Sequence, residues 1–172
     1  VTEKYGLEVA GDFGIIFQIA TAIWHISKIK YQNTIPDVVS KINNGESLRI
    51  ISTDNCKFYI LLYLTGSIAL ITLLHFYPSL LNINLNFITI TAVLLLLLLE
   101  GNTSNYCMLI SYGNEIPYLK PYLISAFFYV TIVFVTIEIA FSLTVLISFQ
   151  IIVQSAYNYW YWPRYLARRY YL

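Results

Sequence analysis

The chain has 172 residues, of which 58% are apolar and 11% are charged, and its formal net charge is +1. Soluble domains carry about 25% charged residues, so this composition excludes an ordinary water-soluble globule. The aromatic content of 17% excludes a disordered chain, the two cysteines exclude a disulfide scaffold, and the near-neutral charge indicates no nucleic-acid partner. About 100 apolar residues would supply five membrane spans of roughly 20 residues each.

Five segments are apolar enough to predict transmembrane helices, and together they predict an all-α polytopic membrane protein with one domain over residues 1–172. The predicted spans are 7–26, 58–76, 87–110, 122–137 and 141–162. The first span is the weakest because it contains Glu8 and Asp12. The last span ends in an aromatic belt over residues 157–162, of the kind that lies at headgroup depth.

Lysine and arginine are concentrated in alternate connections. The connection 27–57 holds five of them, Lys120 lies between the third and fourth spans, and three arginines follow the fifth span, whereas only Lys4 lies on the opposite side. Because positive charge marks cytoplasmic loops, we predict a cytoplasmic C-terminus and an outward-facing Val1. This start, together with the absence of an initial Met, indicates that earlier helices precede the segment.

A short helix is predicted within the connection 27–57. Ile35, Val38, Val39 and Ile42 form an apolar stripe at helical spacing, Thr34 and Pro36 suit its start, and Gly45 suits its end. We expect this helix to lie on the inner membrane surface, with partner docking as the alternative.

Glu100 is the most informative single residue. The uncharged run 88–99 covers only about 18 Å of a hydrocarbon core of roughly 30 Å, so the helix must continue past Glu100 and place it near mid-bilayer. A charge there costs about 2.5–3.5 kcal/mol, which predicts a functional site, with a protonated acid bonded to a neighbouring helix as the alternative. The polar face expected on this helix consists of Glu100, Thr103, Ser104, Cys107 and Ser111.

Two further spans carry polar faces. The first has Gly11, Gly14, Gln18, Thr21 and His25 with Asp12 beside them, and close helix packing is the alternative role of its glycines. The last has Gln150, Gln154, Tyr157, Asn158 and Tyr161, whose amides and rings suit sugar binding, with interhelical bonding as the alternative. Three polar faces predict a shared hydrophilic interior, whose candidate substrate-binding or ion-coupling residues are Asp12, Gln18, Glu100, Asn102, Thr103, Gln150, Gln154 and Asn158.

No enzyme signature is present, and we expect no catalytic residue, cofactor or metal site. The only histidines, His25 and His75, are predicted at opposite membrane surfaces and cannot share a metal. The two cysteines lack metal-knuckle spacing, and there is no Gly-rich phosphate loop, nucleophile elbow or zinc-helix motif.

Several stretches carry the motifs of one family. They are 5–7, 35–37 with Asn44 and Gly45, 100–102, 114–117 with Lys120, and the most specific one, 157–163, which is similar to an Asn-Asn-Trp-Lys-Trp-Pro ending but has Tyr159 and Tyr161 in place of the second Asn and the Lys. Over essentially its whole length the chain thus resembles the O-antigen and capsular polysaccharide flippases of the multidrug/oligosaccharidyl-lipid/polysaccharide exporter superfamily.

The resemblance implies most of one six-helix half of a twelve-helix exporter, with these spans as helices eight to twelve. It implies that a polyprenyl-pyrophosphate-linked oligosaccharide is moved across the bacterial inner membrane for O-antigen or capsule synthesis. Glu100 is our candidate for coupling this transport to a proton or sodium gradient, because an acid in a low-dielectric environment can titrate near neutral pH. The implied partners are the lipid-linked oligosaccharide, membrane lipids and polysaccharide polymerase machinery. The alternatives are a multidrug-type exporter, a membrane-embedded polysaccharide polymerase or ligase, and a non-transporting membrane subunit.

Overall fold

The computed structural model describes residues 6–77, 81, 83–112, 123–124, 126–128, 130–131, 134–135, 142–156 and 158–171. Every regular element in these ranges is a helix, which confirms the all-α prediction for this part of the chain. The helices are α2 (Leu7–Ser27), α3 (Ile29–Asn33), α4 (Ile35–Asn43), α5 (Arg49–Phe76), α6 (Phe87–Ser111), α8 (Leu143–Ala156) and α9 (Asn158–Tyr170).

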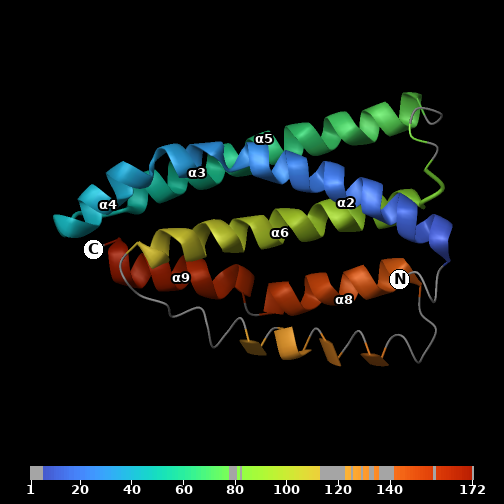
Figure 1. The fold of residues 1–172 in the computed structure, drawn as a ribbon. Helices are drawn as coiled ribbons and strands as arrows, with labels where there is room; N and C mark the ends of the chain where they lie inside the picture. The colour runs from blue at the N-terminus through green and yellow to red at the C-terminus, as the bar shows by residue number, and fades with distance from the viewer. Residues whose placement is uncertain are drawn as a thin grey trace.

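The long helices lie lengthwise beside one another, with α6 in the middle of the bundle (Figure 1). α2 and α5 pack against each other and against one side of α6, while α8 and α9 follow one another along its other side. α3 continues from α2 towards the end of the bundle where α4 and the C-terminus lie (Figure 1). Because α6 has neighbours on two sides, it is the most extensively buried of the described helices.

Three helices are long and apolar enough to cross a membrane: Leu7–Asn33, which joins α2 and α3, then α5, and then α6. α5 has 28 residues and is therefore about 42 Å long, which exceeds a hydrocarbon core of roughly 30 Å. These helices confirm the first three predicted spans as segments able to cross a bilayer. The fourth predicted span, 122–137, is described only in part, and its described residues, 123–124, 126–128, 130–131 and 134–135, are all helical.

The fifth predicted span, 141–162, corresponds to α8 and the first part of α9, and residues 141 and 157 lie outside the described part of the chain. The structure has α8 and α9 here, with 14 and 13 residues, so each is only about 20 Å long. α9 continues past Pro163 to Tyr170, beyond the predicted end of the span. Trp162 was expected at the membrane interface, but it is only 1% exposed and belongs to the core, whereas Trp160 remains exposed.

The connection 27–57 is more helical than expected. The short helix predicted there is confirmed as α4, which follows Thr34, has Pro36 in its first turn and buries Val38. Gly45 comes two residues after its end and has φ +68°, a left-handed conformation that suits glycine. α5 begins at Arg49 rather than at residue 58, and two of the polar residues in its first turns, Ser52 and Asn55, are buried against other parts of the protein.

The surface of α5 is apolar and its buried face is polar, the reverse of a soluble protein. Leu61 and Ile68 are 69% and 63% exposed, whereas Asn55, Tyr59 and Tyr63 are 1% exposed or less. Polar groups are expensive in hydrocarbon unless other protein groups satisfy them, and apolar side chains are stable there. This arrangement is typical of a helix whose outer face meets lipid.

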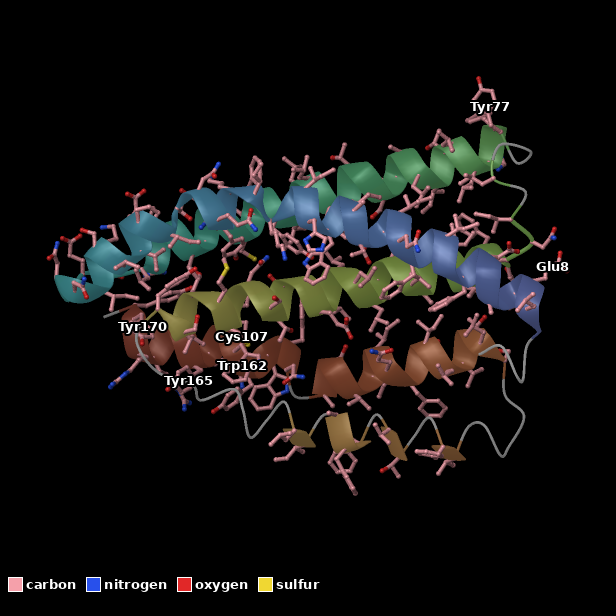
Figure 2. The ribbon with its side chains drawn as sticks, in the orientation of Figure 1. Glu8, Tyr77, Cys107, Trp162, Tyr165 and Tyr170 are labelled. Carbon is pink, nitrogen blue, oxygen red and sulfur yellow. The ribbon has the colours of Figure 1, made fainter. Side chains whose placement is uncertain are left out.

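Basic residues of the described chain gather in one half of the bundle. Figure 2 shows Glu8 and Tyr77 at one end and Tyr170 at the other, where α4 also lies. The lysines and arginines of the described ranges, all on α3, α4, α9, the N-terminal part of α5 or the residue before α3, are Lys28, Lys30, Lys41, Arg49, Lys57, Arg164, Arg168 and Arg169. Membrane proteins orient with their lysine- and arginine-rich connections towards the cytoplasm, so this uneven distribution of basic residues favours one orientation of the bundle.

Candidate functional site

Glu100 lies near the midpoint of α6 and is half-buried beside α8. Its carboxylate atom Oε1 accepts a hydrogen bond of 2.8 Å from the side-chain amide Nε2 of Gln150. Both residues are predicted site residues, and the structure brings them together from two helices. An amide offers both donors and an acceptor, so Gln150 is able to pair with the carboxyl group in either protonation state.

Gly101 of α6 faces side chains of both α2 and α5 at close range. A Cβ atom at this position would overlap the hydroxyl group of Tyr59 and the indole ring of Trp24. The indole Nε1 of Trp24 is buried and has no hydrogen-bond partner. The backbone of α6 next to Glu100 is therefore held between two large rings.

Two tyrosines of α5 donate hydrogen bonds to the backbone of α6. The Tyr59 hydroxyl donates to the carbonyl oxygens of Leu97 and Leu98, at 3.3 and 3.2 Å, and the Tyr63 hydroxyl donates to the carbonyl oxygen of Leu94 at 2.9 Å. These carbonyl groups precede Glu100 by less than two helical turns. The tyrosines thus fix the register of α6 against α5 directly before the acid.

Asn102 belongs to a polar contact between α5 and α6. Its Oδ1 accepts a hydrogen bond of 3.4 Å from the Cys56 thiol, and the Tyr106 hydroxyl donates to the same sulfur at 3.5 Å. Asn105, one turn further along α6, is 1% exposed, and its Nδ2 has no hydrogen-bond partner. Positions two apart in a helix point in nearly opposite directions, so Asn102 and Glu100 lie on different sides of α6.

The expectation of one inward polar face on α6 is wrong in part. Thr103 and Cys107 (Figure 2) are half-buried, but Ser104 is exposed. Asn102 and Asn105 are buried, at 6% and 1% exposed, although both lie off the predicted face. The physical reason is that α6 packs on two sides, so its buried surface does not follow a single stripe.

The polar face predicted on the first span is turned away from α5 and α6. Gln18 is exposed, while the buried positions of α2 include Asp12, Ile16 and Ala20. The alternative role of the glycines is also wrong, since Gly11 and Gly14 have open space where a Cβ atom would stand. The glycines in close contact with neighbouring helices are Gly66 and Gly101.

Asp12 binds the connection before α6 rather than the interior. Its Oδ2 accepts a hydrogen bond of 2.8 Å from the backbone N–H of Asn84, and Glu8 Oε1 accepts one of 2.8 Å from the Asn84 side-chain amide. Glu100 lies about 20 Å further along α6, counted from Phe87. The structure therefore does not bring Asp12 and Glu100 together.

Replacing Asp12 with alanine is expected to release the connection 83–86 from α2. A hydrogen bond to a charged group contributes about 1.5–3 kcal/mol, so amide exchange at Asn84 should accelerate by at least about tenfold. Hydrogen–deuterium exchange measures this directly. Glu8→Ala is the control, because it leaves the backbone bond in place, and equal rates in Asp12→Ala and the unmodified protein would refute the role of Asp12.

The remaining candidates are placed as follows. Asn158 is 3% exposed, and its Oδ1 accepts a hydrogen bond of 3.3 Å from Trp162 Nε1 within α9. Gln154 lies in α8, and its side chain is outside the described set. The Asn158 side chain is therefore bonded within its own helix, to a residue of the same motif, 157–163, that resembles the family.

The polar residues of α5 are the functional candidates that sequence reasoning missed. The signal was available as a helical repeat, but two of its members are tyrosines, which hydropathy counts as apolar. The repeat consists of Ser52, Asn55, Tyr59, Tyr63 and Ser67, which are all buried.

Within the described ranges, no group of three or more His, Cys, Asp or Glu side chains is placed to hold a metal ion. Comparison of the chain with protein-family models, curated proteins and solved structures found no match.

Proposed function

We propose that this chain is part of an exporter that moves a polyprenyl-pyrophosphate-linked oligosaccharide from the inner to the outer leaflet of a bacterial inner membrane. The observation that best supports this proposal is the hydrogen bond between Gln150 and Glu100, which lies near the midpoint of α6. An acid and an amide at this depth are costly in lipid, which supports a polar path between helices. The sugar head would cross along this path while the lipid tail stays in hydrocarbon.

The same pair supports coupling to a proton gradient. Protonation would make one carboxyl oxygen of Glu100 a donor, able to bond the Gln150 side-chain carbonyl, while the other oxygen could still accept from the Gln150 amide. Such a change alters the contact between α6 and α8, the two helices that would separate to open a path. The basic end of the bundle, with the arginines of α9, would face the cytoplasm.

A non-transporting membrane subunit is the second candidate, and a specific observation favours it. Several buried polar groups already bond from helix to helix, including Tyr63 with the backbone of α6 and Cys56 with Asn102. Such contacts stabilise helix association in membranes by about 0.6 kcal/mol each on average. A subunit of this kind would need the polar residues for assembly alone.

Reconstitution of the full-length protein distinguishes these candidates. Proteoliposomes would carry a polyprenyl-pyrophosphate oligosaccharide on the inner leaflet only, and an added glycosidase would report the fraction that reaches the outside. We expect this fraction to rise several-fold above that of protein-free liposomes when a proton gradient is applied. No rise would reject transport of this substrate, and transport of a lipophilic cation instead would indicate a multidrug-type exporter.

A further inference from the structure

An apolar cavity of about 310 Å³ lies between the end of α5 and the start of α6, at the end of the bundle away from the arginines of α9. Its walls combine the last turns of α5, the connection before α6, and the first turn of α6. The described residues that line it are the apolar Ile71, Leu74, Ile83, Leu85, Phe87 and Ile90, together with His75.

The lining and the surroundings of this cavity suit hydrocarbon better than water. An apolar cavity of about 150 Å³ is enough to hold a benzene ring, so this one, which is open to the surface of the bundle, has about twice that room. Phe87 is 60% exposed and Ile90 only 6%, so the cavity leads from the surface of the bundle towards its core. Leu73 and Phe76 beside it are exposed apolar residues, as on a lipid-facing surface.

His75 gives the cavity a polar group at the end of α5. It is exposed and lies in the last turn of the helix, where a basic side chain also interacts favourably with the helix dipole. At this end of the described bundle the charged side chains of α2 are acids, Glu8 and Asp12, and both accept hydrogen bonds from Asn84. His75 is therefore the basic group available there for an anion.

We propose that this cavity binds one acyl chain of a membrane phospholipid, with the phosphate of that lipid next to His75. The chain would enter past Phe87 and end against Ile90. The inference depends on α5 and α6 facing lipid and not on the proposed transport, so either can fail alone. It assigns a lipid site to one end of the bundle.

Photocrosslinking of the full-length protein in nanodiscs tests this site. The probe is phosphatidylglycerol with a diazirine in one acyl chain, and mass spectrometry maps the adducts. We expect adducts on residues 71–76 and 83–90 at several times the level around Leu61, which is exposed on the same helix. Ile90→Trp should fill the cavity and reduce these adducts at least fivefold, and Leu61→Trp should not.

The contribution of His75 is tested with a second probe. His75→Gln should lower crosslinking of the phosphatidylglycerol probe several-fold and leave that of a diacylglycerol probe, which lacks phosphate, unchanged. Leu74→Trp replaces Ile90→Trp if the latter does not fold. Adducts spread in proportion to exposed area, or adducts insensitive to both tryptophan variants, would refute the site. Displacement of the probe by an equal amount of polyprenyl phosphate would refute the phospholipid assignment and identify a carrier-lipid site.

Discussion

Replacing Gly101 with alanine is expected to destabilise the bundle by about 1–3 kcal/mol, the usual range for an extra methyl group forced into a packed interior. The added Cβ would overlap Tyr59 and Trp24. Tyr59 has little freedom to move, because its hydroxyl donates to the carbonyl groups of Leu97 and Leu98. The relief that a flexible side chain would give is therefore absent at this position.

Gly14 provides the matched control for this substitution. It also lies inside a helix, but a Cβ atom there has nothing within 4 Å. Gly14→Ala should therefore leave stability unchanged or raise it by up to about 1 kcal/mol, since alanine favours helices over glycine. Equilibrium unfolding in mixed micelles, followed by tryptophan fluorescence, measures both. Equal stability of the two variants would contradict the close approach of α2, α5 and α6 at Gly101.

Replacing Glu100 with glutamine is expected to remove the dependence of oligosaccharide export on the proton gradient. A glutamine side chain has nearly the size of glutamate and can still form a hydrogen bond to Gln150. Its amide cannot take up or release a proton at physiological pH. Glu100→Leu should reduce export at least tenfold, because it also leaves the Gln150 amide without its carboxyl partner. Gln150→Leu should lower export as well, since it removes the hydrogen bond of 2.8 Å from the Gln150 amide to the acid.

Export in these variants is measured in cells as polysaccharide at the surface, with the proton gradient collapsed by an uncoupler in half of the samples. Glu8→Gln is the control, because Glu8 is exposed and lies at the end of the bundle, beside Asn84. Unchanged gradient dependence in Glu100→Gln would reject the coupling role. Full export in Glu100→Leu would favour the non-transporting subunit.

Hydropathy predicted the helical spans well, because hydrocarbon allows few alternatives to a continuous helix. α2, α5 and α6 all contain the apolar segments expected of them, and α4 follows the stripe that includes Val38. Boundaries were less predictable wherever a helix continues through polar residues. The start of α5 at Arg49 is such a case, because Ser52 and Asn55 face protein rather than water.

The identity of the inward faces could not be predicted from polarity alone. Gln18 carries an amide yet lies on the outer surface, whereas Tyr59 and Tyr63, which count as apolar, bond across the interior. A polar stripe shows where a helix needs a partner, but not whether that partner is a helix, a loop or the solvent. Asp12 is satisfied by the connection at Asn84, a contact between residues 72 positions apart that no local pattern indicates.

Glu100 and Gln150 were both predictable as site residues, because each is a polar side chain within an apolar span. Their direct contact was not predictable, since it depends on how α8 is placed along α6. The depth of a residue in the membrane can be estimated from its position within a span. Which residue of another helix it contacts depends on how the helices pack. The sequence therefore predicted the two residues of the candidate site, and the structure showed that they are in contact.

Deleting the gene that encodes the full-length protein, and then locating the lipid-linked oligosaccharide, tests transport most directly. Inverted and right-side-out membrane vesicles from the deletion strain would be treated with a glycosidase that cannot cross the bilayer. We predict that the oligosaccharide accumulates on the inner leaflet, where only inverted vesicles expose it, and that restoring the gene returns it to the outer leaflet. An unchanged distribution between the two leaflets, with normal polysaccharide at the cell surface, would contradict the proposed function.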